Sequence, residues 1–149
     1  MRVAVGTDHA GFPLKQVALD VIRSLGHDVL DCGADKVIPG DDYPDYAQRV
    51  AQSVQNGSAE RGVLLCGSGV GASVAANKFA GIRAALCHDT FSARQGVEDD
   101  DMNVLCLGAR VVGPALVGDI LRAFMGASFS KAERHRRRVA KIQEFERRT

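Results

Sequence analysis

Short apolar segments alternate with helical segments along the whole chain, and this alternation constrains the fold more than any other feature. The strand-like segments are rich in Val and Leu, and they cover residues 2–7, 27–31, 62–66, 83–87 and 104–107. A strand–helix repeat of this kind builds a parallel sheet with helices on both faces, joined by right-handed crossovers. The sequence therefore predicts an α/β fold with one domain over residues 1–149.

The segments between these strands have helical spacing. Pro13 suits the first turn of a helix, and Gly26 is a good residue to end it. The other predicted helices cover residues 46–54, 72–79, 90–98 and 114–124, and most of the tail from residue 131. Residues 33–43 are polar and rich in turn-forming residues, which predicts an exposed loop.

Composition argues against several functional classes. The net charge of +1 is not that of a general nucleic-acid or membrane binder. No apolar run approaches the roughly 20 residues that span a bilayer, and the N-terminus lacks the pattern of a signal peptide. The cysteines form no CxxC pair and no metal-ligand spacing, so we expect free thiols in a reducing, cytoplasmic setting without a metal. They are Cys32, Cys66, Cys87 and Cys106.

Positive charge is concentrated in the tail. Residues 131–149 carry a net charge of +5, which leaves −4 for the rest of the chain. Arg134 and Arg138 are four residues apart, so they share one helix face and could hold an anion. A solvated basic face is the simpler interpretation, and a nucleic-acid arm is disfavoured because aromatic residues do not alternate with the basic ones.

Two glycine-containing loops follow predicted strands, at the edge where parallel sheets bind ligands. They are residues 6–11 (GTDHAG) and 66–71 (CGSGVG). Glycine lets backbone N–H groups approach an anion, and a following helix start adds a favourable dipole, so the second loop could stabilise a phosphate or an enediolate. A tight turn is the simpler interpretation.

A dinucleotide-binding pattern is also present in that loop. Gly67, Gly69 and Ala72 match G-x-G-x-x-A, and Asp89 lies about 20 residues further on. The match is weak because the motif follows the third strand rather than the first, and the chain has no room for a second catalytic domain.

Cys66 ends the third predicted strand. Cysteine is often a buried structural residue, and this interpretation holds for Cys32, Cys87 and Cys106. Cys66 differs because it stands beside backbone amides and a helix start, which should stabilise its thiolate. Ser68 could hydrogen-bond a substrate oxygen or orient the thiol.

The sequence resembles the type B ribose-5-phosphate isomerases, which are related to the galactose-6-phosphate isomerase subunits. The resemblance covers nearly the whole chain. Its marks are TDHAGFPLK at 7–15, DYPDYA at 42–47, LLCGSGVGASVAANKFAGIRAAL at 64–86, NVLCLGARVVG at 103–113 and RHRRRV at 134–139.

The resemblance implies a Rossmann-like three-layer α/β/α sandwich with a five-stranded parallel sheet and a protruding C-terminal helix. It implies a homodimer, or a dimer of dimers, whose sites use residues of both subunits, with the basic helix of residues 131–149 packing on the partner. The implied activity is the interconversion of ribose 5-phosphate and ribulose 5-phosphate in the pentose phosphate pathway, without cofactor or metal.

The resemblance also implies roles for individual residues. Cys66 would move a proton between C1 and C2 of the sugar, and Ser68 would lie close to the enediolate. The residues that would bind the sugar and its phosphate are Asp8, His9, Tyr43, Gly67, Ser68, Gly69, Val70, Gly71, Asp100, Arg110, Arg134 and Arg138.

The chain departs from the family at one position. Many members have a histidine that opens the furanose ring, and here that position is Asp99. Asp99 could act as the acid if Asp100 and Asp101 raised its pKa by repulsion. The three aspartates could also be a solvated loop or a helix cap, and Asp99 could be an inactivating substitution.

A different substrate would also account for Asp99. A tetrose 4-phosphate has no free 4-hydroxyl and cannot close a furanose ring, so an isomerase of erythrulose 4-phosphate would need no ring-opening acid. Outside the enzymes, a sugar-phosphate- or nucleotide-binding module without catalysis is the remaining alternative.

Overall fold

The computed structural model describes residues 1–147, and its centre is a sheet of five parallel strands. The strands are β1 (Arg2–Thr7), β2 (Asp28–Asp31), β3 (Arg61–Cys66), β4 (Ala84–Leu86) and β5 (Val104–Gly108). Their order across the sheet is β2-β1-β3-β5-β4. Each strand lies within one residue of its predicted bounds, so the five-stranded parallel sheet is confirmed.

The helices follow the predicted alternation. They are the short 3₁₀ helix η1 (Phe12–Leu14), α1 (Lys15–Ser24), α2 (Tyr43–Gln55), α3 (Val70–Ala76), α4 (Thr90–Asp100), α5 (Pro114–Gly126) and α6 (Glu133–Glu146).

Helix α3 departs most from its predicted range, because it begins and ends earlier than residues 72–79. Asn77 caps its C-terminal end, and the Asn77 side-chain amide donates to the Ala84 carbonyl at 2.8 Å and accepts from the Ala84 N–H at 2.9 Å. These two hydrogen bonds turn the chain away from the helix and into β4.

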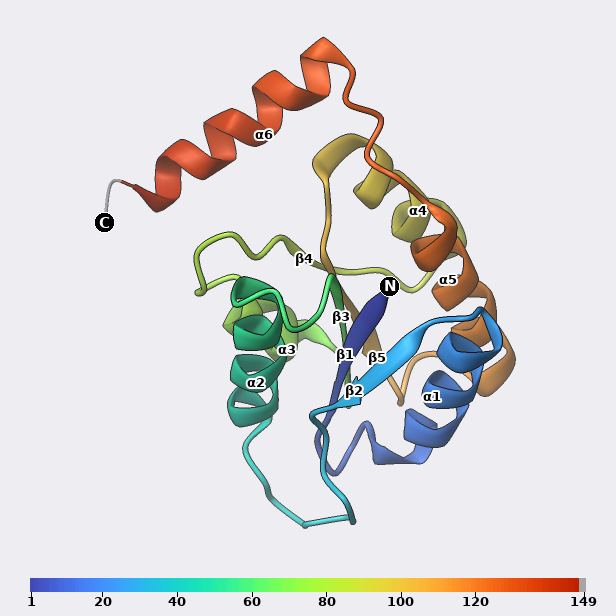
Figure 1. Ribbon diagram of the computed structural model, residues 1–149. Helices are drawn as coiled ribbons and strands as arrows, with labels where there is room; N and C mark the ends of the chain where they lie inside the picture. The colour runs from blue at the N-terminus through green and yellow to red at the C-terminus, as the bar shows by residue number, and fades with distance from the viewer. Residues whose placement is uncertain (148–149) are drawn as a thin grey trace.

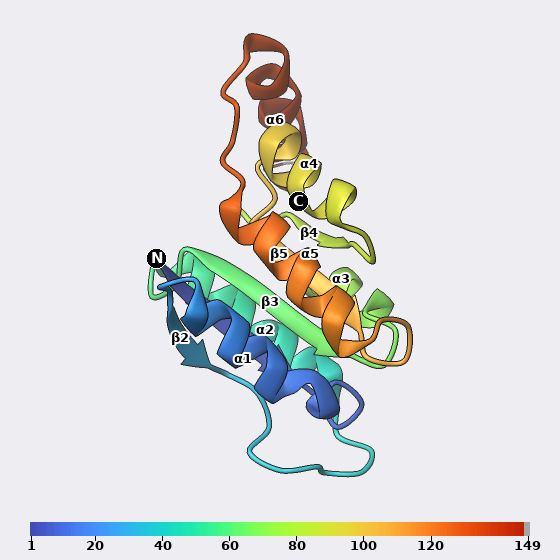
Figure 2. The ribbon, with the colours of Figure 1, turned by 90° about the vertical axis from the view of Figure 1, so that its right-hand side faces the viewer.

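The sheet is the middle layer of three. Figures 1 and 2 show α1 and α5 on one face and α2 and α3 on the other. Successive side chains of a strand point to opposite faces. Val63 and Leu65 therefore join the core beneath α1 and α5, whereas Leu64 and Cys66 join the core beneath α2 and α3.

Helix α6 extends away from the sheet and returns over the chain near β4 (Figure 1). Its buried residues are His135 and Val139. Near its end the Glu146 carboxylate accepts from the Gly81 N–H at 3.0 Å. The helix confirms the predicted protruding element within residues 133–146, and the prediction for Arg148 and Thr149 lies outside the described residues.

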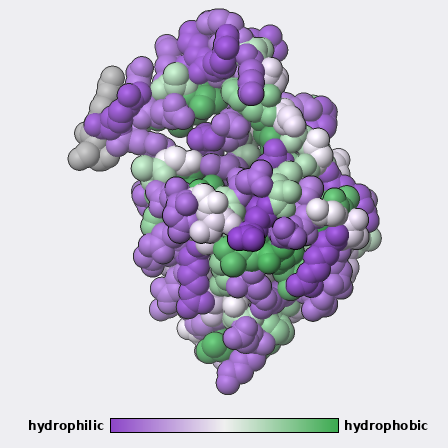
Figure 3. All heavy atoms as spheres, in the orientation of Figure 1, coloured by the Kyte–Doolittle hydropathy of each residue, from purple (hydrophilic) through white to green (hydrophobic). Residues whose placement is uncertain are grey.

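The exposed face of the molecule in Figure 3 is hydrophilic over most of its area, including α6, with a smaller hydrophobic patch on the body below that helix. Within residues 1–147, every helix is too short or too polar to cross a bilayer.

Candidate functional site

The carboxyl ends of β1, β3 and β5 meet at one edge of the sheet. In the register of the sheet, Thr7 pairs with Leu65 and Cys66 pairs with Gly108, so the three loops that follow these strands are neighbours. They surround a cavity of about 330 Å³. This is the edge at which the sequence predicts a ligand site.

The cavity brings together eight of the predicted site residues: Asp8, His9, Tyr43, Cys66, Gly67, Ser68, Gly71 and Arg110. Ala10 and Val111 also line it and were not predicted. Their apolar side chains carry no chemical signal in the sequence. Gly69 and Val70 do not line the cavity, although they belong to the same loop and helix start.

Cys66 is nearly buried, with 6% of its surface exposed. The N–H of Gly69 donates to its sulfur at 3.0 Å. Burial nevertheless raises the pKa of the Cys66 thiol, and the negative charge of Asp8 adds to this, while backbone amides including that of Gly69 act in the opposite direction. The expected stabilisation of the thiolate is therefore present, but it is outweighed within one chain.

The backbone of the loop depends on glycine. Gly69 has φ = +82°, the left-handed conformation that starts α3. At Gly71 an added Cβ would lie 2.5 Å from Cζ of Tyr43, so the absence of a side chain lets the tyrosine ring lie against the helix. The Ser68 hydroxyl accepts from the Val70 N–H at 3.3 Å and lies at the cavity wall.

His9 is held by an aspartate that the sequence did not single out for function. The ring Nδ1 of His9 lies 2.6 Å from Oδ1 of Asp41, and the His9 backbone N–H donates to the same oxygen at 3.0 Å. The Tyr46 hydroxyl donates to Oδ2 of Asp41 at 2.8 Å. Asp41 was placed in an exposed loop, and no spacing in the sequence shows that this loop folds back onto residue 9.

Asp8, His9 and Asp41 could offer three ligand atoms to a metal ion, since these atoms lie within 4.8 Å of one another. Each residue already has a hydrogen-bond partner. Asp8 accepts from the Gly11 N–H at 2.8 Å, and His9 and Asp41 bind each other. The arrangement is accounted for by hydrogen bonding within the protein.

Asp99 lies on α4, outside the Cys66 cavity of its own chain. Its Oδ2 accepts from the Gln95 amide at 2.7 Å, and its Oδ1 lies 3.4 Å from Nδ1 of His135 on α6. The Ser130 hydroxyl lies 2.7 Å from the same histidine nitrogen. Asp99 thus stands where α6 packs against α4.

Asp101 has a partner of opposite charge that the sequence did not indicate. It has the left-handed conformation that ends α4, and its carboxylate pairs with Arg83 at 2.7 Å. Its charge is therefore balanced by the guanidinium of Arg83, which weakens the expected repulsion.

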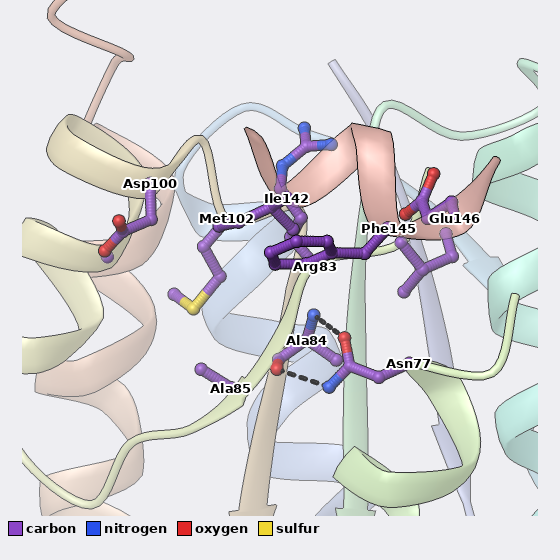
Figure 4. A pocket seen from close by; sticks show the side chains of 11 residues that line it. Asn77, Arg83, Ala84, Ala85, Asp100, Met102, Ile142, Phe145 and Glu146 are labelled. Carbon is purple, nitrogen blue, oxygen red and sulfur yellow. Dashed lines mark hydrogen bonds between the residues drawn. The ribbon is translucent and has the colours of Figure 1, made fainter. Parts of the chain in front are cut away.

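Asp100 lines a second cavity, of about 370 Å³, between α6 and the strand β4. Figure 4 shows Ile142 and Phe145 of α6 above Ala84 and Ala85, with Asp100 at one side. Phe145 is 64% exposed although it faces this cavity.

Arg134 and Arg138 are exposed on α6, on one face of the helix as their spacing predicted. Like Asp99 and Asp100, they do not line the Cys66 cavity within the described chain. The predicted site is therefore divided: one part surrounds Cys66, and the other part lies on α4 and α6.

Asp89 has a structural contact in place of the dinucleotide role that the G-x-G-x-x-A pattern suggested. Its carboxylate accepts from the Ser92 N–H at 2.6 Å and caps the N-terminus of α4.

Comparison with known proteins agrees with the fold. Residues 3–142 match the family model described as ribose/galactose isomerase. Ribose-5-phosphate isomerase B of Escherichia coli is 43% identical, over 99% of this chain and 97% of its own length. D-erythrulose-4-phosphate isomerase of Pectobacterium atrosepticum is 40% identical, over 87% of this chain and 85% of its own length.

A solved structure, that of ribose-5-phosphate isomerase B from Mycoplasma genitalium with bound ribulose-5-phosphate, superimposes with a TM-score of 0.93. It is 36% identical and covers 99% of this chain and 97% of that chain. The match of the family model over most of the chain, together with these identities, shows that the chain belongs to the ribose/galactose isomerase family.

Proposed function

We propose that the protein is a sugar-phosphate aldose–ketose isomerase that interconverts ribose 5-phosphate and ribulose 5-phosphate. The observation that carries this proposal is the position of Cys66, whose sulfur accepts from the Gly69 N–H in a cavity lined by His9 and Arg110. A proton-transfer group, amide donors and a cation for the phosphate are the groups that isomerisation through an enediolate needs.

In this mechanism the thiolate of Cys66 removes the proton from C2 of the open-chain aldose, and the electron pair passes through the C1–C2 bond to the carbonyl oxygen O1. The enediolate then takes a proton back at C1, while the proton on O2 moves to O1 and leaves a ketone at C2. Ser68 and the amides of the glycine loop stabilise the charged oxygens.

A complete site requires a second copy of the chain. Within the described residues, Arg110 is the only Lys or Arg that lines the Cys66 cavity, so a doubly charged phosphate would be held by a single guanidinium in one chain. Arg134 and Arg138 are exposed on a projecting helix, and Val70 and Val74 expose apolar surface beside the glycine loop. We therefore propose a homodimer, alone or as a dimer of dimers, in which α6 of one subunit brings its arginines to the Cys66 cavity of the other.

Asp99 and Asp100 enter that site from the second subunit in the same proposal. Either ribose 5-phosphate or a tetrulose phosphate is an appropriate substrate for the Cys66 chemistry, and the pentose is favoured because ribose-5-phosphate isomerases are prominent among the relatives. A cytoplasmic location is part of the proposal, since all four cysteines are free thiols.

Isotope exchange tests the function directly. Incubating ribulose 5-phosphate in deuterated water with the enzyme should place deuterium at C2 of the aldose that forms. Cys66→Ala should abolish exchange, whereas Cys32→Ala, which removes a half-buried thiol outside the cavity, should leave it intact. Aldose formation at the wild-type rate by Cys66→Ala would contradict the proposal, as would binding of sugar phosphate without exchange by the wild type.

A further inference from the structure

Ribose 5-phosphate is a closed furanose, so an isomerase must open the ring before Cys66 can act. This requirement rests on the function proposed above. We propose that His9, held in place by Asp41 and Tyr46, is the acid–base group that opens the ring in this protein.

The hydrogen bonds around His9 leave one ring nitrogen available. Nδ1 lies 2.6 Å from Asp41, and Asp41 is fixed in turn by the Tyr46 hydroxyl and the His9 backbone N–H. The proton of the neutral imidazole therefore stays on Nδ1, and Nε2 carries the free lone pair. His9 lines the Cys66 cavity and its side chain is 31% exposed, so a substrate can reach it.

Asp41 stays ionised and can stabilise an imidazolium. Burial acts to raise the pKa of Asp41, but the hydrogen bonds from His9 and Tyr46 outweigh it and hold the pKa below its ordinary range. A carboxylate behind the imidazole favours the uptake of a proton by the opposite nitrogen, as in other histidine–aspartate pairs.

Asp99 is less suited to ring opening. Its two carboxylate oxygens face Gln95 and His135, and Asp101, which could have kept it protonated by repulsion, is paired with Arg83. A group that carries a proton from O1 to the ring oxygen needs an accessible lone pair near Cys66, and His9, unlike Asp99, lines the Cys66 cavity of its own chain.

One histidine can carry out both proton transfers of ring opening. Nε2 takes the proton from the C1 hydroxyl, the O1 electron pair forms the C1=O bond, and the bond between C1 and the ring oxygen O4 breaks. The imidazolium then returns its proton to O4. Both oxygens are bonded to C1, so one nitrogen reaches both, and no co-reactant is consumed.

The titratable and charged groups that share this environment come from five parts of the chain. They are Asp8 in the loop after β1, Asp41 in the loop before α2, Tyr43 and Tyr46 on α2, Cys66 at the end of β3, and Arg110 after β5.

The experiment compares a closed and an open substrate. Ribulose 5-phosphate cannot form a furanose because its 5-hydroxyl is phosphorylated, so deuterium exchange at its C1 reports proton transfer without ring opening. The central variant is His9→Gln, which keeps a hydrogen-bonding amide near the position of Nε2 but cannot carry a proton. Turnover of ribose 5-phosphate should fall about 100-fold, and exchange on ribulose 5-phosphate should fall less than about threefold.

A second readout separates ring opening from a merely structural effect. The rate of His9→Gln on ribose 5-phosphate should reach a plateau as the enzyme concentration rises, because spontaneous ring opening then limits the reaction. The wild-type rate should stay proportional to enzyme.

The positioning role of Asp41 has its own variant. Asp41→Asn should lower turnover of ribose 5-phosphate selectively. Deuterium exchange on ribulose 5-phosphate, which does not require ring opening, should change by less than about threefold. Asp35→Asn removes the same charge from an exposed position in the same loop and should change neither quantity.

The outcomes distinguish the two proposals. Equal losses on both substrates by His9→Gln, or unchanged turnover of ribose 5-phosphate, overturn the role of His9. A selective loss with Asp99→Asn in place of His9→Gln assigns ring opening to Asp99 and also overturns it. Wild-type enzyme that exchanges no deuterium into ribulose 5-phosphate overturns the isomerase function itself.

Discussion

The backbone N–H of Gly69 donates to the sulfur of Cys66 at 3.0 Å, at the point where β3 ends and α3 is about to begin. The bond orients the sulfur and gives a thiolate one charge-stabilising partner. Burial and the charge of Asp8 oppose it and raise the pKa of the thiol. In the unliganded chain we therefore expect Cys66 to be mostly protonated at neutral pH.

Alkylation of Cys66 should show this directly. We expect its rate, followed by mass spectrometry of the modified peptide, to rise with pH and reach half its maximum above the value of about 8.5 for a free cysteine. Asp8→Asn keeps an acceptor for the Gly11 N–H but removes the charge, so it should move the midpoint to lower pH. A short cysteine peptide is the reference, and a wild-type midpoint below that of the peptide would contradict the expectation.

The need for glycine at position 69 can be measured by comparison with Gly57, where an added side chain would have no close neighbour. Gly69 and Gly57 both have positive φ, +82° and +77°, but an added Cβ meets Leu86 at 2.5 Å in the first case and nothing within 4 Å in the second. Gly57→Ala should cost about 1 kcal/mol of unfolding free energy from backbone strain. Gly69→Ala should cost about 1–3 kcal/mol more from overpacking. Urea unfolding measures both, and equal losses would show that Leu86 moves aside freely.

Most of the fold was predictable because its causes are local. The apolar, β-branched segments predicted the strands, and Pro13 and Gly26 predicted the two ends of the first helix. The alternation of strands and helices then required a parallel sheet. The start of α3 was predicted too late because Gly69 enters the helix from a left-handed conformation, which the spacing of apolar residues does not show. Its end was predicted too late because Asn77 binds Ala84, a contact made only in the folded chain.

The site was predictable to the extent that it follows strand ends. Cys66 and the glycine loop were identified from their position, and the cavity confirms that they lie beside Asp8, His9 and Arg110. Asp41 was missed because its role depends on a polar loop folding back over 32 positions of sequence to reach His9. The pKa of Cys66 could not be predicted either, since it depends on how deeply the sulfur is buried.

Asp89 caps α4, and its carboxylate should make the stability of the fold depend on pH. The Ser92 N–H hydrogen bond holds the pKa of Asp89 below its ordinary value, so the carboxylate stabilises the fold above a pH of about 3.9. This contribution is lost as the pH falls through the lower value of the folded state. Asp89→Ala should therefore lower the thermal midpoint at pH 7 and have a smaller effect at pH 3. Asp35→Ala, at an exposed position, is the control. A destabilisation by Asp89→Ala that is constant from pH 7 to pH 3 would contradict this assignment.

Mixed dimers test whether α6 completes the site of another subunit. Cys66→Ala chains and Arg134→Ala/Arg138→Ala chains should each be nearly inactive alone. In a hybrid dimer one site holds both defects and the other holds none. Equal mixing by unfolding and refolding should therefore restore roughly a quarter of the wild-type activity. Arg136 is exposed, lies two residues from both Arg134 and Arg138, and is on another side of the helix. Arg136→Ala chains should therefore stay active alone. Failure of the mixture to recover activity, with hybrid dimers demonstrated by native mass spectrometry, would place Cys66 and the two arginines in the site of one chain.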